Sequence, residues 1–169
     1  MPARKRKPLV AVLDWKPAPA SNDGVEIEKQ ILGKTARAKY FLISTEADLT
    51  PEALNADAII LWQNTKVTER VMAKMVNCRV FVRNGVGYDT VDINAAARLG
   101  IPVCNVPDYG TEEVADHAIA LAMAQVRQLF PLNQEAKQLG WKLHIKDKLR
   151  RLSTLTFGIV GLGRIGTAC

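Results

Sequence analysis

The sequence predicts an α/β protein with a doubly wound parallel sheet, followed by the beginning of a second α/β unit. Short apolar segments alternate strictly with helical patterns over residues 9–106. These segments are apolar along nearly their whole length, as strands are when helices cover both faces of a parallel sheet. A long amphipathic pattern and a glycine-rich segment follow in residues 111–169, which indicates a second unit of the same class.

The first unit is expected to contain five strands and four helices. The strands are expected at Leu9–Trp15, Lys39–Ser44, Asp57–Trp62, Arg79–Gly85 and Ile101–Val106, and the helices at Gly24–Lys34, 50–54, Thr68–Met75 and Asp92–Gly100. Thr50, Thr68 and Asp92 precede helical patterns and have side chains that accept hydrogen bonds from a first turn, so each is a predicted N-cap. Because strand–helix–strand crossovers are right-handed, a five-stranded flavodoxin-like sheet is the natural arrangement.

A different pattern begins after Val106. Thr111 is a predicted cap for a long helix, and its apolar residues at 114, 115, 118, 119, 121, 122, 126 and 129 would form a wide buried face. Residues 131–154 are expected to be irregular, and Thr156–Leu162 is expected to form a buried strand. We therefore place a boundary near Val106–Tyr109, between one domain at 1–106 and another at 107–169.

Composition limits the class of protein. Apolar residues make up 48% of the 169 residues and charged residues 24%, which is typical of a soluble globular protein. No apolar run approaches the ~18 residues of a membrane span, so no membrane partner is expected. Cys78, Cys104 and Cys169 lie far apart without a C-x-x-C pair, which favours reduced thiols in a cytoplasmic protein.

The formal net charge of +6 is concentrated in two basic clusters, Arg4–Lys7 and Lys142–Arg151. Runs of this kind can bind nucleic acid or a nuclear import receptor, and the first run leaves a nuclear location open. Neither run is accompanied by a DNA-binding motif or an aromatic-lined groove. We therefore interpret both as solvated segments and do not expect nucleic acid as a partner.

The last residues read TFGIVGLGRIGTAC, in which Gly161, Gly163 and Gly166 form the pattern G-x-G-x-x-G. An apolar segment precedes the pattern and a helix start follows it, as in a dinucleotide-binding turn. There the first glycine permits a tight turn, the second lets the backbone approach a pyrophosphate, and the third allows close helix–strand contact. The alternative is a turn that uses its glycines for packing alone. The acidic residue that separates NAD from NADP is expected about 20 residues further on, so this sequence leaves the choice open.

A second pair of glycines, Gly85 and Gly87 on either side of Val86, follows the fourth predicted strand. In open α/β sheets, ligands bind beyond the carboxyl ends of the strands, where the backbone N–H groups of such turns can hold an anion. Arg83 would add a charge-assisted hydrogen bond to a small carboxylate. An ordinary turn, with Arg83 in a surface ion pair, explains the same spacing equally well.

A resemblance over nearly the whole chain decides between these interpretations. Phe81–Pro107, the helix from Thr111 and the segment GIVGLGRIG resemble, in register, the D-isomer-specific 2-hydroxyacid dehydrogenases. That family includes 3-phosphoglycerate dehydrogenase, glyoxylate/hydroxypyruvate reductases, formate dehydrogenase and the C-terminal-binding protein corepressors. The resemblance implies a homodimeric oxidoreductase that transfers a hydride between NAD, or NADP, and a small 2-hydroxy or 2-oxo carboxylic acid. It also implies that residues 1–106 begin the substrate domain and that 107–169 begin a Rossmann NAD(P)-binding domain.

The resemblance also assigns roles to individual residues. Arg83, Gly85, Val86 and Gly87 match the segment that binds the substrate carboxylate, and position 86 borders the nicotinamide in the family. The pyrophosphate loop is matched by Gly161, Gly163, Arg164, Ile165 and Gly166. Several relatives carry Ser or Thr where Val86 stands, so a hydroxyl contact to the cofactor is lost. The loop Gln63–Lys66 varies with substrate in the family and therefore does not name the substrate.

The family's catalytic His, Glu and Arg lie downstream of the glycine pattern, and we assign no catalytic residue to this sequence. His117 lies in the predicted long helix, where a structural role is expected, and His144 lies in the basic segment, where it is expected to face solvent. We therefore expect a truncated product or fragment that is inactive alone. The alternative is a non-catalytic module, either a corepressor-like NAD sensor or a dimerising partner of a complete enzyme.

Overall fold

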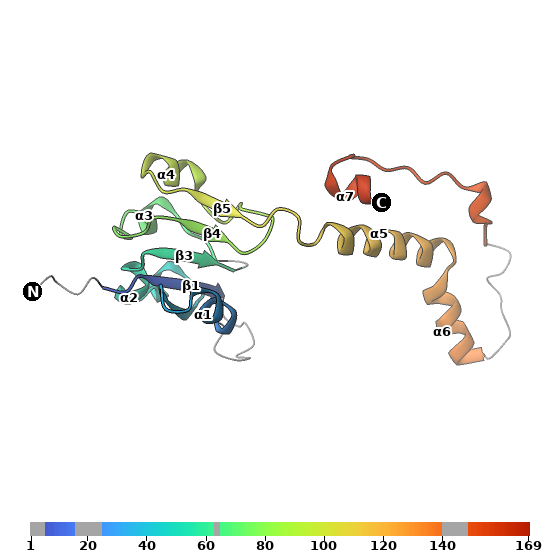
Figure 1. Ribbon diagram of the computed structural model, residues 1–169. Coiled ribbons are helices and arrows are strands. Elements are labelled where there is room, and N and C mark those ends of the chain that lie inside the picture. The colour runs from blue at the N-terminus through green and yellow to red at the C-terminus, as the bar shows by residue number, and fades with distance from the viewer. Residues whose placement is uncertain (1–5, 16–24, 63–64, 140–148) are drawn as a thin grey trace, which may run out of the picture. The chain divides into compact units, whose positions relative to one another are not determined.

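A five-stranded parallel sheet forms the centre of the first of two compact units. The computed structural model describes residues 6–15, 25–62, 65–139 and 149–169, and it divides into Met1–Tyr109 and Gly110–Cys169. In the first unit the strands follow the order β2-β1-β3-β4-β5, and every neighbouring pair is parallel (Figure 1). This arrangement confirms the predicted α/β class and the flavodoxin-like sheet.

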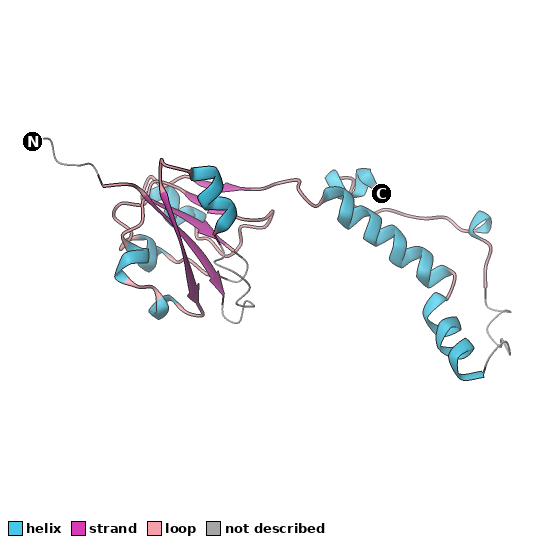
Figure 2. Ribbon diagram, turned by 60° about the horizontal axis from the view of Figure 1, so that its bottom comes forward, coloured by secondary structure: helices cyan, strands magenta, loops and turns pink. Residues whose placement is uncertain are grey.

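The elements of the first unit alternate as predicted, with slightly different bounds. The strands are β1 Leu9–Trp15, β2 Arg37–Ile43, β3 Ala58–Leu61, β4 Phe81–Arg83 and β5 Val103–Asn105, drawn in magenta in Figure 2. The helices are α1 Glu26–Leu32, α2 Pro51–Leu54, α3 Glu69–Met72 and α4 Ile93–Arg98, with a 3₁₀ helix at Glu46–Asp48. The β1-to-β2 crossover runs across the sheet in the opposite direction from the other three. The right-handed rule therefore puts α1 on one face and α2, α3 and α4 on the other.

The main hydrophobic core lies between the sheet and α2, α3 and α4. Alternate residues of a strand point to the same face, so one face of β1, β3 and β4 contributes every second residue. Its deeply buried members include Ala11, Leu13, Ile59, Leu61 and Phe81 from the strands, and Ala53, Met72 and Ala95 from the helices. This core fixes the carboxyl ends of the central strands, where the candidate site lies.

The three N-cap residues predicted for the first unit hold that position, and two of them make the capping hydrogen bond. The Thr50 hydroxyl accepts a hydrogen bond from the Ala53 N–H at 3.2 Å, and the Asp92 carboxylate accepts one from the Ala95 N–H at 2.9 Å. Thr68 is the N-cap residue of α3 as predicted, but its hydroxyl donates to the Glu46 carboxylate and makes no capping hydrogen bond. These bonds to Thr68 and Arg70 lower the pKa of Glu46.

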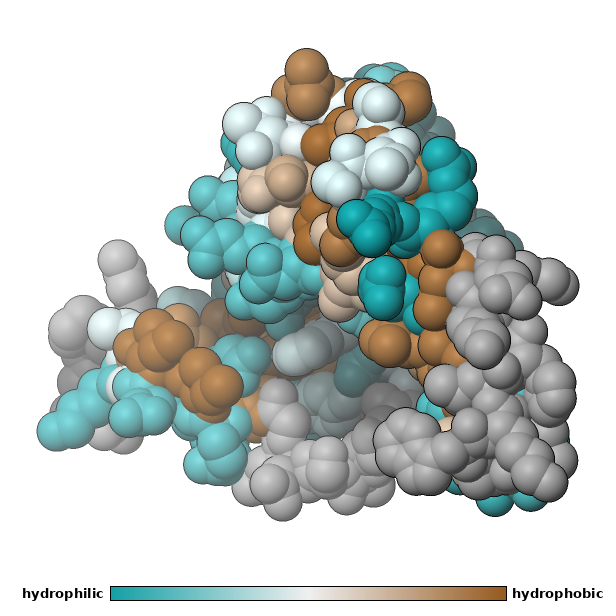
Figure 3. All heavy atoms as spheres, turned by 90° about the vertical axis from the view of Figure 1, so that its right-hand side faces the viewer, coloured by the Kyte–Doolittle hydropathy of each residue, from teal (hydrophilic) through white to brown (hydrophobic). Residues whose placement is uncertain are grey.

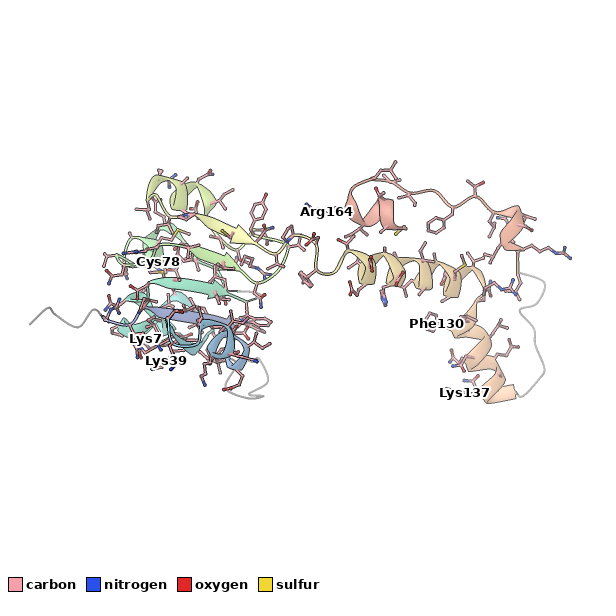
Figure 4. The ribbon with its side chains drawn as sticks, viewed as in Figure 1. Lys7, Lys39, Cys78, Phe130, Lys137 and Arg164 are labelled. Atoms are coloured by element: carbon pink, nitrogen blue, oxygen red, sulfur yellow. The ribbon has the colours of Figure 1, made fainter. Side chains whose placement is uncertain are left out.

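The described part of the basic N-terminal cluster is bonded to the first unit. Arg6 Nη2 donates to both Asp57 carboxylate oxygens at 2.9 Å, and the Lys7 ammonium lies 3.5 Å from the Gly33 carbonyl oxygen (Figure 4). Asp57 also accepts from the Leu9 N–H at 2.7 Å, at the start of β1. Arg6 and Lys7 are exposed, as the interpretation of this cluster as a solvated segment requires, and Arg6 in addition forms an ion pair with Asp57.

The second unit consists of helices and extended connections. It contains α5 Thr111–Val126, α6 Leu129–Leu139, a 3₁₀ helix at Leu152–Thr154, and α7 Arg164–Ala168. Gly110 is the N-cap of α5, so the predicted Thr111 cap is wrong. The irregular segment expected from residue 131 is also wrong as far as residue 139, because Pro131 lies in the first turn of α6. Proline is tolerated in a first turn, where its missing N–H leaves no helical hydrogen bond unmade.

Two further predictions for the second unit are wrong. In α5 only Ala115 and Ala124 are buried, while Val114 and Leu121 are 50% and 49% exposed. Thr156–Leu162 is not a strand, and Val160 is fully exposed. A strand needs a hydrogen-bonded neighbour, and within residues 110–139 and 149–169 there is no other strand to pair with it. Figure 3, viewed from the side of this unit, shows brown apolar surface interspersed with teal polar surface.

Candidate functional site

The loop after β4 lies at the carboxyl edge of the sheet. Arg83 is the last residue of β4, and α4 begins at Ile93. The Asn84 N–H donates to the Leu61 carbonyl at 2.8 Å, and the Val106 N–H donates to the Gly85 carbonyl at 3.1 Å. These two bonds tie the start of the loop to β3 on one side and to the end of β5 on the other. The loop therefore leaves the sheet in a defined direction.

The Arg83 side chain is half-buried at the start of this loop. Its Nη1 donates to the Asn84 carbonyl at 2.5 Å, while Nε is buried and has no hydrogen-bond partner. A Cβ atom at Gly85 would lie 2.5 Å from Nη1, so the guanidinium occupies space that only a glycine leaves open. Within the described ranges Arg83 makes no ion pair. The surface ion pair that the sequence left open as an alternative is therefore not observed.

Val86 and Gly87 form the exposed part of the loop, and Val86 is 48% exposed. In the part of the chain that the structure describes, the N–H groups of both residues have no hydrogen-bond acceptor. The Asp89 carboxylate lies on one side of Gly87, where a Cβ would be 3.1 Å from Oδ1. Two unbonded N–H groups and an arginine without a carboxylate partner are the donors that a small anion requires. The structure thus brings the four predicted residues at 83 and 85–87 into one loop.

Asn105, the last residue of β5, is a member of this site that sequence reasoning missed. Its Nδ2 donates to the Val86 carbonyl at 2.8 Å, and it is the register partner of Arg83 in the sheet. A polar residue at the end of the strand beside the loop was the available signal. Periodicity does not reveal this bond, because it joins a strand end to a loop 19 residues earlier.

The glycine pattern forms a tight turn in the second unit. Gly161 has φ +97°, a conformation that favours glycine, and Gly163 is the N-cap of α7. A Cβ at Gly166 would lie 1.9 Å from the Gly161 carbonyl oxygen, so the third glycine is required for the helix to approach the turn. Arg164, labelled in Figure 4, and Ile165 are the first two residues of α7. The predicted residues at 161, 163, 164, 165 and 166 are therefore brought together in one turn.

Several cavities formed by the described residues lie outside the loop at 83–87. A cavity of about 550 Å³ beside α4 and β5 is lined by Tyr88, Ile93, Ala97, Gly100, Ile101, Pro102, Val103, Cys104 and Asn105. A cavity of about 370 Å³ at the carboxyl edge is lined by Ile43, Ser44, Thr45, Glu46, Thr65, Lys66 and Thr68. The first has no charged lining residue and offers no countercharge to a carboxylate. The second has Lys66, and a further cavity of about 290 Å³ is lined in part by Arg70 and Lys74, so both are rival positions for an anion on this unit.

The remaining candidates supply no second site. His117 lies on α5 with an exposed side chain, so burial does not support its expected structural role, and His144 lies outside the described residues. No group of acidic, histidine and cysteine side chains suited to a metal ion occurs in the described ranges. None of the helices found there is long and apolar enough to cross a membrane. Cys78, Cys104 and Cys169 are free, and burial raises the pKa of the Cys78 thiol.

Comparison with known proteins places most of the chain in a family. The model of the D-isomer specific 2-hydroxyacid dehydrogenase catalytic domain matches residues 10–158. The D-3-phosphoglycerate dehydrogenase of Synechocystis is 36% identical over 149 residues, which cover 85% of this chain and 25% of the relative. The enzyme of the same name from Archaeoglobus fulgidus is 37% identical over 119 residues, which cover 70% of this chain and 22% of that one.

Solved structures show the same likeness. The D-lactate dehydrogenase of Aquifex aeolicus, complexed with NAD and lactic acid, has a TM-score of 0.73 and 25% identity, covering 94% of this chain and 46% of that one. An NADPH-dependent glyoxylate/hydroxypyruvate reductase from Sinorhizobium meliloti has a TM-score of 0.68 and 30% identity, and the match covers 95% of this chain and 49% of that one. The chain thus spans about a quarter of the curated relatives and about half of these structures. The match over residues 10–158 confirms the resemblance inferred from the sequence: the chain belongs to the D-isomer specific 2-hydroxyacid dehydrogenase family.

Proposed function

We propose that this chain supplies the carboxylate-binding part of an oxidoreductase that transfers a hydride between a nicotinamide cofactor and a 2-hydroxy or 2-oxo acid. The observation that carries the proposal is the loop at 83–87, with two unbonded N–H groups and an arginine that has no carboxylate partner. A 2-oxo acid presents a carboxylate next to a carbonyl. In this arrangement the Val86 and Gly87 N–H groups bind the carboxylate, and Arg83 contributes positive charge.

In this proposal the two units have different roles. Residues 1–106 form the beginning of a substrate domain, and residues 107–169 form the beginning of a cofactor domain. The turn at Gly161–Gly166 fits a pyrophosphate group, because its positive-φ glycine and its close Gly161–Gly166 approach leave no side chain over the backbone. Gly161, Gly163, Arg164, Ile165 and Gly166 would hold the pyrophosphate of NAD or NADP, and Val86 would border the nicotinamide. When bound, the nicotinamide supplies the hydride donor or acceptor.

The chain of 169 residues is expected to bind a substrate without turning it over. Hydride transfer of this kind needs a positioned acid/base group. His117 and His144 do not match the family's catalytic position, and His117 is exposed on α5. We therefore expect no oxidation of NADH with glyoxylate, hydroxypyruvate or pyruvate. Measurable turnover by the purified chain would contradict this part of the proposal and would require a role for one of these histidines.

Equilibrium dialysis with labelled glyoxylate tests the carboxylate site. The variant Arg83→Gln removes the positive charge and should lower affinity about tenfold, since hydrogen bonds to charged groups contribute about 1.5–3 kcal/mol. The matched control is Arg79→Gln, because Arg79 is an exposed arginine two residues before β4 begins. Equal glyoxylate affinity in the original chain and in Arg83→Gln would show that Arg83 takes no part in binding.

A second candidate role is dimerisation, which exposed apolar side chains of the second unit favour. Leu121, Met123, Leu129 and Phe130 are 49%, 40%, 55% and 65% exposed on α5 and α6, and Figure 4 labels Phe130. Side chains of this size gain free energy when a second chain covers them. Sedimentation equilibrium should show a dimer that Leu121→Glu weakens, and a monomer at all concentrations would exclude this role.

A further inference from the structure

We propose that Asn105 is a positioning residue for the carboxylate site: its side-chain amide fixes the Val86 carbonyl and thereby turns the Gly87 N–H toward the ligand, beside the Val86 N–H. This inference rests on the proposed function of the loop. Asn105 is the last residue of β5, and its Nδ2 lies 2.8 Å from the Val86 carbonyl oxygen. It would act through the loop, without touching the reacting atoms.

Two consecutive loop carbonyls are bonded to the end of β5. The Gly85 carbonyl accepts from the Val106 N–H at 3.1 Å, and the Val86 carbonyl accepts from Asn105. Because the donors belong to neighbouring residues of one strand end, both carbonyl oxygens point toward β5. Two adjacent peptide groups therefore have the same orientation relative to the sheet.

The orientation of a carbonyl fixes the orientation of the N–H in the same peptide group. In a planar trans peptide the C=O and N–H bonds point in opposite directions. The peptide that carries the Gly85 carbonyl also carries the Val86 N–H, and the peptide that carries the Val86 carbonyl also carries the Gly87 N–H. Both N–H groups therefore point away from β5, and in the described residues neither has an acceptor. Two such donors side by side make an anion-binding concavity.

Of these two peptides, only the one between Val86 and Gly87 depends on a side chain. The Val106 N–H belongs to the backbone, so it holds the first peptide whatever the residue type. The second peptide is held by the Asn105 amide, which is exposed and has no deeply buried packing role. Loss of this bond would let the second peptide rotate, so that ligand binding would have to order it again. Preorganisation of this kind raises affinity without adding any contact to the ligand.

Two variants remove the bond without adding charge. Asn105→Leu has nearly the same shape as asparagine and lacks the donor, and Asn105→Ser keeps a donor on a shorter side chain. The matched control is Asn94→Leu, because Asn94 is an exposed asparagine of α4 whose side chain makes no hydrogen bond in the described ranges. Each protein is the full chain of 169 residues, titrated with glyoxylate by equilibrium dialysis, and its melting temperature is measured in parallel.

Both Asn105 variants are expected to bind glyoxylate about fivefold more weakly, as follows from the loss of one hydrogen bond of about 1 kcal/mol. Their melting temperatures should stay close to that of Asn94→Leu. In the unliganded protein, nuclear magnetic resonance should show a changed carbonyl carbon shift at Val86, which a role in general stability would not produce. Unchanged affinity in both variants, with glyoxylate bound by the original chain, overturns the role of Asn105 and leaves the proposed function standing. Failure of the original chain to bind glyoxylate overturns both.

Discussion

At Gly85 the absence of a side chain determines where the Arg83 guanidinium lies. A Cβ there would approach Nη1 to 2.5 Å, and the backbone has φ +156°. The contact involves the end of a flexible side chain, so Arg83 can move away with little loss of core contacts. The consequence of adding a methyl group should therefore appear mainly in ligand binding.

We expect Gly85→Ala to displace Arg83 and to weaken glyoxylate binding about as much as Arg83→Gln, with a loss of stability of about 1 kcal/mol from the strained backbone. Dialysis and urea unfolding measure the two effects. Gly110→Ala is the matched control, because a Cβ at Gly110 meets no atom within 4 Å. Unchanged affinity in Gly85→Ala would show that the guanidinium position does not matter for binding.

Tyr40 provides a titration that reports on the first unit. Its hydroxyl donates to Asp14 Oδ2 at 2.5 Å, and burial, followed by this bond and the Asp14 charge, raises the Tyr40 pKa from 10.0 to about 12. A raised folded-state pKa gives stability that is complete below the unfolded pKa and is lost as pH rises through the folded one. The stability of the original chain relative to Tyr40→Phe should therefore fall between pH 10.0 and about 12. The difference in tyrosinate absorbance between the two proteins measures the Tyr40 pKa, and a midpoint near 10.0 would contradict this environment.

Among the elements, α7 depends most directly on one residue. A Cβ at Gly166 would lie 1.9 Å from the Gly161 carbonyl oxygen, and backbone atoms cannot yield as a side-chain end can. We expect Gly166→Ala to disorder the turn and remove the helical shifts of α7, as read from backbone chemical shifts. Gly158→Ala is the control, because a Cβ at that position meets nothing within 4 Å. Retained α7 shifts in Gly166→Ala would mean that the turn has another conformation in solution.

Elements determined by their own residues could be predicted from the sequence, and those that depend on a partner segment could not. The five strands and the Thr50 and Asp92 caps follow from apolar runs and from side chains that bond within one helical turn. Thr68 holds the predicted N-cap position of α3, but the sequence did not reveal that its hydroxyl bonds to Glu46, 22 residues earlier. The strand at 156–162 failed because a strand requires a neighbour in the same unit. Asn105 was missed for the same reason, since its bond to Val86 joins two elements.

At the scale of the whole molecule, the chain combines a sheet whose carboxyl edge carries the loop at 83–87 with a helical unit that carries a glycine turn. The sheet unit has its own hydrophobic core, which holds the ends of β3, β4 and β5 around the loop. The α/β class, the flavodoxin-like sheet and the family were all predicted from sequence and are confirmed. The roles of the loop and of the turn remain proposals, which only ligand binding tests.

The most direct test is a residue-by-residue map of backbone amide shifts in the isotope-labelled chain during titration with glyoxylate. The largest shifts are predicted at Val86 and Gly87, with a smaller change at Arg83, because the unbonded N–H groups receive the carboxylate. Shifts centred on Ser44, Thr65 and Lys66, which line the 370 Å³ cavity, with residues 83–87 unmoved, would contradict the proposal.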